Sequence, residues 1–121
     1  GQKAWLDEVL QKSSSDEVSL IFTHHPFFLE SIDEDDGYFQ IQKDKRHTYF
    51  DMFKEHGVNA VFAGHLHDSR AAEYQGIPML TTTSAAYQLG KSAPSVRVIR
   101  VNGDEVSEEL VVIVPESADK Q

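Results

Sequence analysis

Two short apolar runs, each followed at once by histidines, constrain the fold of this chain more than any other feature. The run over residues 18–22 leads into Thr-His-His-Pro, and the run over residues 58–63 leads into Gly-His-Leu-His. Short apolar runs bounded by Gly or Pro are typical of buried strands in a parallel sheet. Pro26 cannot donate to a strand ladder, and Gly64 permits a sharp turn. The sequence therefore predicts two buried strands with histidines at their carboxyl ends.

The rest of the chain indicates helices in its first half and further strands in its second. An amphipathic helix is expected over residues 3–12 and a second helix over residues 43–56, with Gly57 placed as a helix-ending glycine. This order favours an α/β fold whose second half is mainly antiparallel. The remaining expected segments are an acidic loop over 30–40, a strand over 77–83, a hairpin of strands 96–101 and 106–114 across Asn-Gly, and a frayed tail over 116–121.

Composition excludes several classes of protein. The chain has 11 Lys and Arg against 20 Asp and Glu, a formal net charge of −9, so neither nucleic acid nor an anionic membrane is expected as a partner. It has no cysteine, which excludes disulfides, thiolate catalysis and zinc–thiolate sites. No apolar run approaches the roughly 18 residues that a membrane span needs. With no signal-peptide pattern at its start, we expect a cytoplasmic location.

Four of the six histidines, namely His24, His25, His65 and His67, follow the two predicted strands. In open α/β sheets the carboxyl edge is where ligands bind, and imidazole is the commonest metal-binding side chain. His65 and His67 are one residue apart, a spacing that serves two cations about 3.5–4 Å apart, as in two-metal hydrolases. A single histidine after a strand is ordinarily a surface or core residue, but two such motifs together favour a metal site. His47 and His56 fall in the predicted second helix and are expected to be solvated.

These motifs resemble the metal-binding segments of the calcineurin-like metallophosphoesterases. Thr-His-His-Pro at 23–26 is similar to the family's fourth motif, and Gly-His-Leu-His at 64–67 matches its final motif. The opening residues 2–6 resemble the Gln-x-x-Trp-Leu helix that often precedes the fourth motif. Segments 31–36 and 87–90 resemble a vertebrate member of the family that is regarded as a serine/threonine protein phosphatase. The resemblance extends over most of residues 2–114.

The resemblance implies a fold and a reaction. The fold is the C-terminal half of a four-layer α/β/β/α sandwich with a mixed sheet, in which residues 1–121 are the C-terminal part of one domain. The family pattern gives His24 and His65 to one divalent cation and His67 to the other, with Mn, Fe, Zn or Co as the metals. His25 has no ligand role in that pattern and would lie behind the ligands or face the substrate. The implied reaction is hydrolysis of a phosphoester, in a phosphoprotein or a small molecule, by a hydroxide held between the two metals.

The family's three earlier motifs, Asp-x-His, Gly-Asp-x-x-Asp and Gly-Asn-His-Asp/Glu, do not occur in this sequence. They would supply the bridging aspartate, the other ligands and the histidine that assists the leaving group. We therefore expect the chain alone to be inactive and its partner to be the missing N-terminal half of the same domain. One alternative is a relic without catalysis; another is a non-catalytic binding domain whose histidines hold a single structural or adventitious ion. A metal-independent hydrolase using Ser84 and His67 lacks the usual nucleophile-elbow pattern.

The acidic stretch over residues 30–36 has two readings. Its composition resembles a calcium loop, but the glycine and terminal glutamate that such a loop needs are missing. A solvated loop at the rim of the site fits the residues better, and Tyr38 and Phe39 beside it are placed to close over a substrate.

Overall fold

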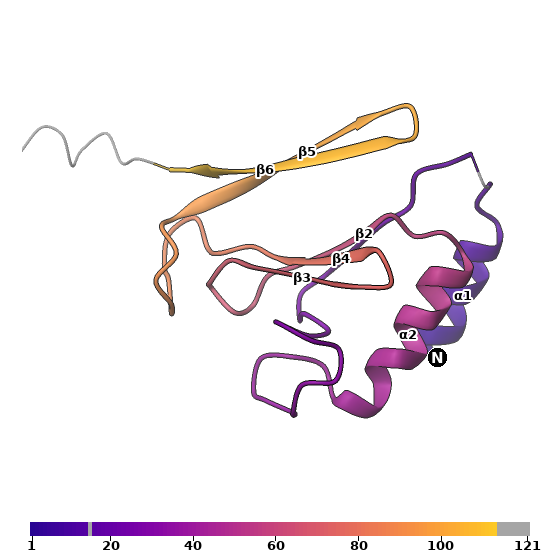
Figure 1. Cartoon of the computed structure of the whole chain (residues 1–121), viewed down its shortest axis with the longest axis horizontal. Helices are drawn as coiled ribbons and strands as arrows, with labels where there is room; N and C mark the ends of the chain where they lie inside the picture. Colours follow the sequence, from indigo (N-terminus) through magenta and orange to yellow (C-terminus); the bar gives the residue numbers. More distant parts are fainter. Residues whose placement is uncertain (15, 114–121) are drawn as a thin grey trace, which may run out of the picture.

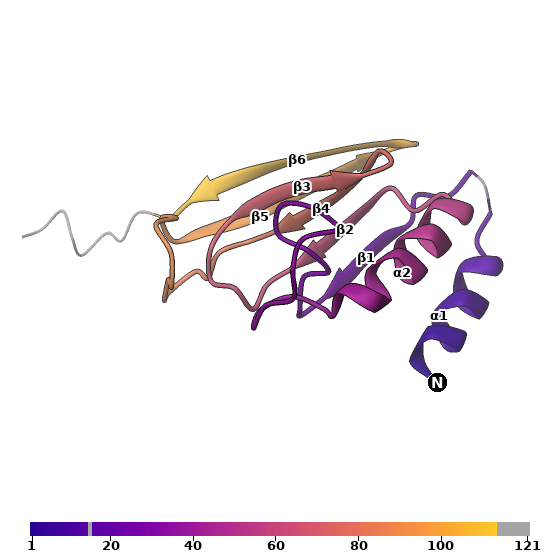
Figure 2. The same cartoon turned by 60° about the horizontal axis from the view of Figure 1, so that its bottom comes forward.

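A four-stranded mixed sheet forms the centre of the protein in a computed structural model, which describes residues 1–14 and 16–113 (Figure 1). Two helices lie against one face of this sheet and a two-stranded hairpin against the other (Figure 2). The elements in chain order are α1 (Gln2–Gln11), β1 (Leu20–Thr23), α2 (Lys43–Glu55), β2 (Ala60–Ala63), β3 (Arg70–Tyr74), β4 (Ile77–Thr81), β5 (Ser95–Asn102) and β6 (Glu105–Val112).

The strand order β1-β2-β4-β3 places the two histidine-bearing strands side by side. β1 and β2 are parallel, with Phe22 opposite Phe62 and Thr23 opposite Ala63, so their carboxyl ends meet at one edge. The amide of Gly64 donates to the carbonyl of His24 at 3.0 Å, which continues the pairing beyond the strands. β4 extends the parallel set, and β3 closes the sheet antiparallel to β4. The register explains why histidines distant in sequence lie near one another.

The larger core lies between the sheet and the two helices. Its aromatic part is a group of rings with centroids 5.0–5.7 Å apart, formed by Phe27, Phe28, Phe50 and Phe53. Val61 and Met79 of the sheet are fully buried beneath them. Edge-to-face and tilted aromatic contacts of this kind add about 0.5–1.5 kcal/mol per pair to the burial itself. The segment after β1 is therefore fixed to the helix layer, which holds the neighbouring histidines in place.

The opposite face of the sheet is covered more thinly. Among the described residues, the buried hydrophobic side chains there are Ala60, Phe62 and Leu80, which pack against Leu20 and Ile99. The hairpin of β5 and β6 is tied down by Arg97, whose Nε donates to the Thr82 hydroxyl at 2.9 Å. Phe22 stacks on Phe62 yet remains 66% exposed. Apolar side chains along the hairpin, among them Val101 and Val112, are also exposed.

The structure confirms the predicted α/β class and the mixed sheet. Gly57, at φ 70°, ends α2, and Gly103, at φ 64°, makes the predicted turn between β5 and β6. β4 ends at Thr81, short of the predicted end at residue 83, whereas β5, over Ser95–Asn102, extends beyond the predicted strand 96–101. The predicted end of the last strand at Val114 and the tail over 116–121 lie outside the described residues. No helix in the described part of the chain is both long and apolar enough to cross a membrane.

Two expectations were wrong or incomplete. β3 was not predicted, because its residues, Arg-Ala-Ala-Glu-Tyr, include no β-branched side chain; pairing with β4 across a tight Gln75-Gly76 turn makes it a strand. His56 was expected to be solvated, but its side chain is only 15% exposed and its Nε2 lies 2.9 Å from Asp7 Oδ1. This contact joins the end of α2 to α1, a pairing that helical periodicity does not reveal.

Candidate metal centre

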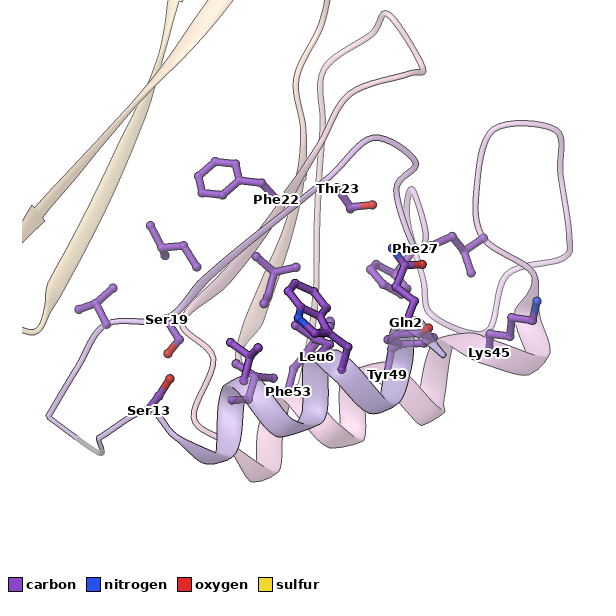
Figure 3. Close-up of a pocket in the computed structure, with 17 residues that line it drawn as sticks. Gln2, Leu6, Ser13, Ser19, Phe22, Thr23, Phe27, Lys45, Tyr49 and Phe53 are labelled. Carbon is purple, nitrogen blue, oxygen red and sulfur yellow. The ribbon is translucent and has the colours of Figure 1, made fainter.

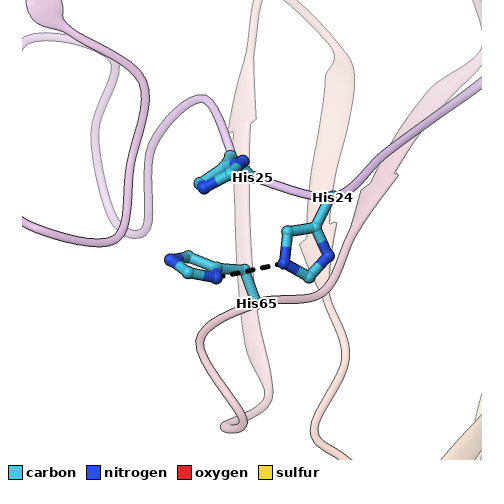
Figure 4. Close-up of side chains that lie close together, drawn as sticks. All are labelled: His24, His25 and His65. Atoms are coloured by element: carbon cyan, nitrogen blue, oxygen red, sulfur yellow. Dashed lines mark hydrogen bonds between the residues drawn. The ribbon is translucent and has the colours of Figure 1, made fainter.

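The loops that follow β1 and β2 bring His24, His25 and His65 into one cluster (Figure 4). One ring nitrogen from each of the three lies within 4.8 Å of the others. His24 Nε2 is 3.1 Å from His65 Nδ1, and the His25 and His65 rings have centroids 4.2 Å apart. With metal–nitrogen bonds of about 2.0–2.1 Å, the ligating nitrogens of two imidazoles on one tetrahedral ion lie about 3.3 Å apart. The spacing of His24 and His65 therefore suits a shared cation.

The backbone of the loop after β2 is strained at both of its histidines. His65 has φ 63° and His67 has φ 56°, a left-handed conformation that residues other than glycine adopt uncommonly. Each such residue costs on the order of 1 kcal/mol, and strain of this kind gathers at functional sites. Leu66 between them is 7% exposed and anchors the loop in the protein interior. One buried residue thus keeps two imidazoles available at the sheet edge.

His67 stands apart from the cluster of three. Its Nδ1 is 2.6 Å from the carbonyl oxygen of Tyr87, and the amide of Leu89 donates to the carbonyl of His67 at 3.1 Å. Since a carbonyl oxygen only accepts, Nδ1 carries the proton and donates it, which leaves the lone pair of Nε2 free. Metal-binding histidines are commonly oriented by such a bond from their other nitrogen. The geometry therefore suits His67 as a ligand, although another loop orients it.

The lowered pKa of His65 also suits a cation. Partial burial lowers the pKa of His65, and the neighbouring rings of His25, His24 and His67 lower it further. A neutral imidazole has the lone pair that a metal needs. The three grouped residues are all histidines, and no carboxylate joins them among residues 1–14 and 16–113. Imidazole donors fit Zn, Fe and related borderline cations.

Asp68 is a residue of the site region that the sequence did not reveal. Its carboxylate accepts hydrogen bonds from the hydroxyl and the amide of Ser92 and from Arg70 Nε. The Ser92 hydroxyl is the main cause of the lowered pKa of this carboxyl, which holds despite the opposing effect of burial. A Cβ atom at Gly90 would collide with the Asp68 carboxylate, so this side chain packs directly against the backbone of Gly90. Because Ser92 lies 24 residues from Asp68, no local pattern marks this contact.

Comparison with known proteins shows that this chain is similar to serine/threonine-protein phosphatases. The relatives are serine/threonine-protein phosphatase CPPED1 from several vertebrates. The identity is 36% over 107 residues with the Rattus norvegicus protein and 37% over 108 with the Homo sapiens protein, covering 87% of this chain. With the Danio rerio protein it is 34% over 106 residues, or 86% of the chain.

These similarities support the resemblance to calcineurin-like phosphoesterases. In each case the matched region is 34% of the relative, so the chain spans about a third of the length of these phosphatases. No protein-family model matches the chain.

Proposed function

We propose that the protein to which this chain contributes is a metal-dependent phosphoesterase that acts on phosphomonoesters, including phosphoserine or phosphothreonine in proteins. The observation that carries the proposal is the meeting of His24 and His65 at 3.1 Å, from two parallel strand ends, in a chain similar to phosphatases. A carboxyl edge of a parallel sheet is a common ligand site, and the donors there are metal-binding groups.

Each histidine has a proposed role in this site. His24 and His65 would hold one divalent cation, and the free Nε2 of His67 would hold a second. His25, whose ring packs on His65, would face the substrate. Two bound cations would provide a nucleophile at neutral pH and stabilise charge on the phosphate oxygens. The chain's own contribution is to orient the imidazoles, which the Tyr87 carbonyl and the strained loop favour.

The carboxylate ligands and the rest of a four-layer sandwich would come from the remainder of the domain. An open apolar groove with a cavity of about 630 Å³ runs between α1 and β1, and Trp5, Val9 and Phe22 line it (Figure 3). Within the described sheet, β1 pairs only with β2 and its other edge is open. Trp5 is 59% exposed in this groove. Exposed apolar surface beside an open strand edge usually meets another chain segment, which supports the missing half as partner.

The proposal is tested on the intact protein with His65→Ala. Initial rates are measured with a phosphopeptide and a small aryl phosphate at saturating Mn²⁺. We expect the variant to lose about two orders of magnitude or more in rate, because one cation loses a ligand. His47→Ala is the matched control, since this histidine lies on α2, bonds Asp33 and takes no part in the cluster. A wild-type rate in His65→Ala would sink the proposal.

A second candidate is a non-catalytic domain that holds one ion. The absence of a carboxylate from the three-histidine group, within the described residues, favours it. It predicts a monodisperse 121-residue chain by light scattering, one bound ion, and no phosphatase activity in any longer form. A self-associating or unstable chain would count against it.

A further inference from the structure

The loop over residues 26–41, which we name the aromatic loop, is fixed from within by a buried arginine. The amide of Ile41 donates to the carbonyl of Pro26 at 2.9 Å and closes the loop at its base. Arg46 of α2 is 0% exposed, and its guanidinium donates to the carbonyls of Ile41 at 2.8 Å, Ile32 at 3.2 Å and Glu34. Burying a guanidinium is costly unless its donors are satisfied. Here they are used to hold one loop.

Glu34 fixes the same loop from its other side. Its carboxylate accepts from the amides of Leu29, Glu30 and Ser31 at 2.7–3.0 Å, and from the side-chain amide of Gln40 at 2.8 Å. Burial alone would raise the pKa of this carboxyl, but the hydrogen bonds outweigh it and the pKa lies below its ordinary value. Such compact loops, with their ends close and their interior filled, are frequently functional.

The tip of this rigid loop carries two aromatic rings to the histidine cluster. The Tyr38 ring lies 6.1 Å from the His65 ring at 28° to it, and the Phe39 ring lies 5.5 Å from the same ring. The two aromatic rings contact each other at 86°, with centroids 5.0 Å apart. The backbone at Gly37, just before Tyr38, lies close to the Gln40 side chain, which in turn donates to Glu34. Tyr38 is 84% exposed, so its position adds little to the core.

We infer that Tyr38 and Phe39 form an aromatic wall for the organic group of a ligand whose phosphoryl group lies at the histidines. The inference rests on the proposed function and deepens it, because it names a substrate class: phosphate esters with a planar ring or an apolar group beside the phosphoryl group. The exposed acidic residues of the loop, Asp33, Asp35 and Asp36, repel an anion. Cations held by the histidines would bind the phosphoryl group, while the two rings hold the organic part.

The test uses phosphonates, whose P–C bond is not hydrolysed, so binding is measured apart from turnover. Phenylphosphonate and methylphosphonate are titrated by calorimetry into the Zn²⁺-loaded intact protein. An aromatic contact is worth about 0.5–1.5 kcal/mol, so we expect phenylphosphonate to bind about three- to tenfold more tightly. Tyr38→Ala should remove most of this preference without changing methylphosphonate binding. Tyr38→Phe keeps the ring and should keep the preference.

Equal affinities for the two phosphonates would overturn the inference, and so would an undiminished preference in Tyr38→Ala or binding of neither compound. The outcome is separate from that of the rate measurement with His65→Ala. Loss of the preference with hydrolysis intact removes only the aromatic wall. A ring-dependent preference in a protein that hydrolyses no phosphoester removes only the enzymatic proposal.

Discussion

The two loops that flank the histidines are fixed in different ways. The aromatic loop, residues 26–41, is organised around the buried guanidinium of Arg46 and the carboxylate of Glu34. The loop over residues 84–92, which carries the Tyr87 carbonyl to His67, is held by Asp68 at one end and by the Ser84 hydroxyl at the other. The Ser84 hydroxyl accepts from the amides of Ala86 and Tyr87, both at 3.0 Å.

The difference shows how burial sets the strength of a polar anchor. In water, hydrogen bonds to a loop are exchanged for bonds to solvent and contribute little, whereas a buried donor that loses its partner costs the full desolvation energy. Arg46 has no exposed surface, but Asp68 is partly solvated. We therefore expect the aromatic loop to be the more rigid of the two, and the loop that orients His67 to open more easily.

Arg46→Met should have the largest effect on stability, because it leaves three carbonyls of the aromatic loop without their donor. We expect a loss of about 3–5 kcal/mol in the free energy of unfolding, measured by urea denaturation with circular dichroism. Arg46→Lys keeps the charge but not the forked geometry, so its free energy of unfolding should lie between those of the wild type and Arg46→Met. A loss below about 1 kcal/mol in the Met variant would mean that the loop is anchored elsewhere.

Metal affinity should distinguish His67, which the loop over residues 84–92 orients, from His25, which directly precedes the aromatic loop. If His24, His65 and His67 are the ligands, His67→Ala should weaken Zn²⁺ or Co²⁺ binding at least about tenfold, since even outer partners of metal ligands are worth 10–100-fold. His25→Ala should then change it by less than about threefold. Calorimetry and Co²⁺ absorption report the result. The reverse order would favour the three-imidazole cluster and the single-ion domain.

Asp68→Asn tests the weaker anchor. The amide keeps the shape but loses the charge that the Ser92 hydroxyl, the Ser92 amide and Arg70 contact, so we expect a loss of about 1–2 kcal/mol in unfolding free energy. Gly90→Ala should act on the same contact by collision. Hydrogen exchange at residues 84–92 is the local measurement. A loss as large as that of Arg46→Met would break the distinction between the two loops.

Acid should loosen the aromatic loop by a smaller amount. The pKa of Glu34 in the folded state lies below its ordinary value of 4.5, so its stabilising effect is complete above that value. The effect is lost as the pH falls through the lower, folded-state pKa. Glu34→Gln should remove this component, which a series of urea midpoints between about pH 3 and 6 detects against the wild type. Identical pH profiles for the two proteins would contradict the role given to Glu34.

Local patterns in the sequence carried much of the fold. The apolar runs before His24 and His65 indicated two strands, the Asn-Gly turn indicated the hairpin of β5 and β6, and Gly57 marked the end of α2. Such features depend on periodicity and on backbone preferences of a few adjacent residues, so they can be read without the fold. That the two histidine motifs lie at the same edge followed from the expectation of a parallel sheet. The parallel pairing of β1 with β2 confirms this expectation.

The same reasoning could not find the groups that act at a distance. Nothing local shows that Arg46 on a polar helix is fully buried, or that Asp68 reaches Ser92. β3 exists because β4 offers it an edge, and His56 is covered because α1 packs beside it. Each of these features depends on which segments pack together when the chain folds.

What the sequence by itself determined was that two strands end in histidines and that the family's acidic motifs are lacking from these residues. Only the tertiary structure decided which imidazoles touch: His25 joins His24 and His65, while His67 turns to the Tyr87 carbonyl. The reason is that side-chain direction at a strand end depends on the turn that follows. Here the turn takes left-handed backbone angles at His65 and His67, with Leu66 buried between them.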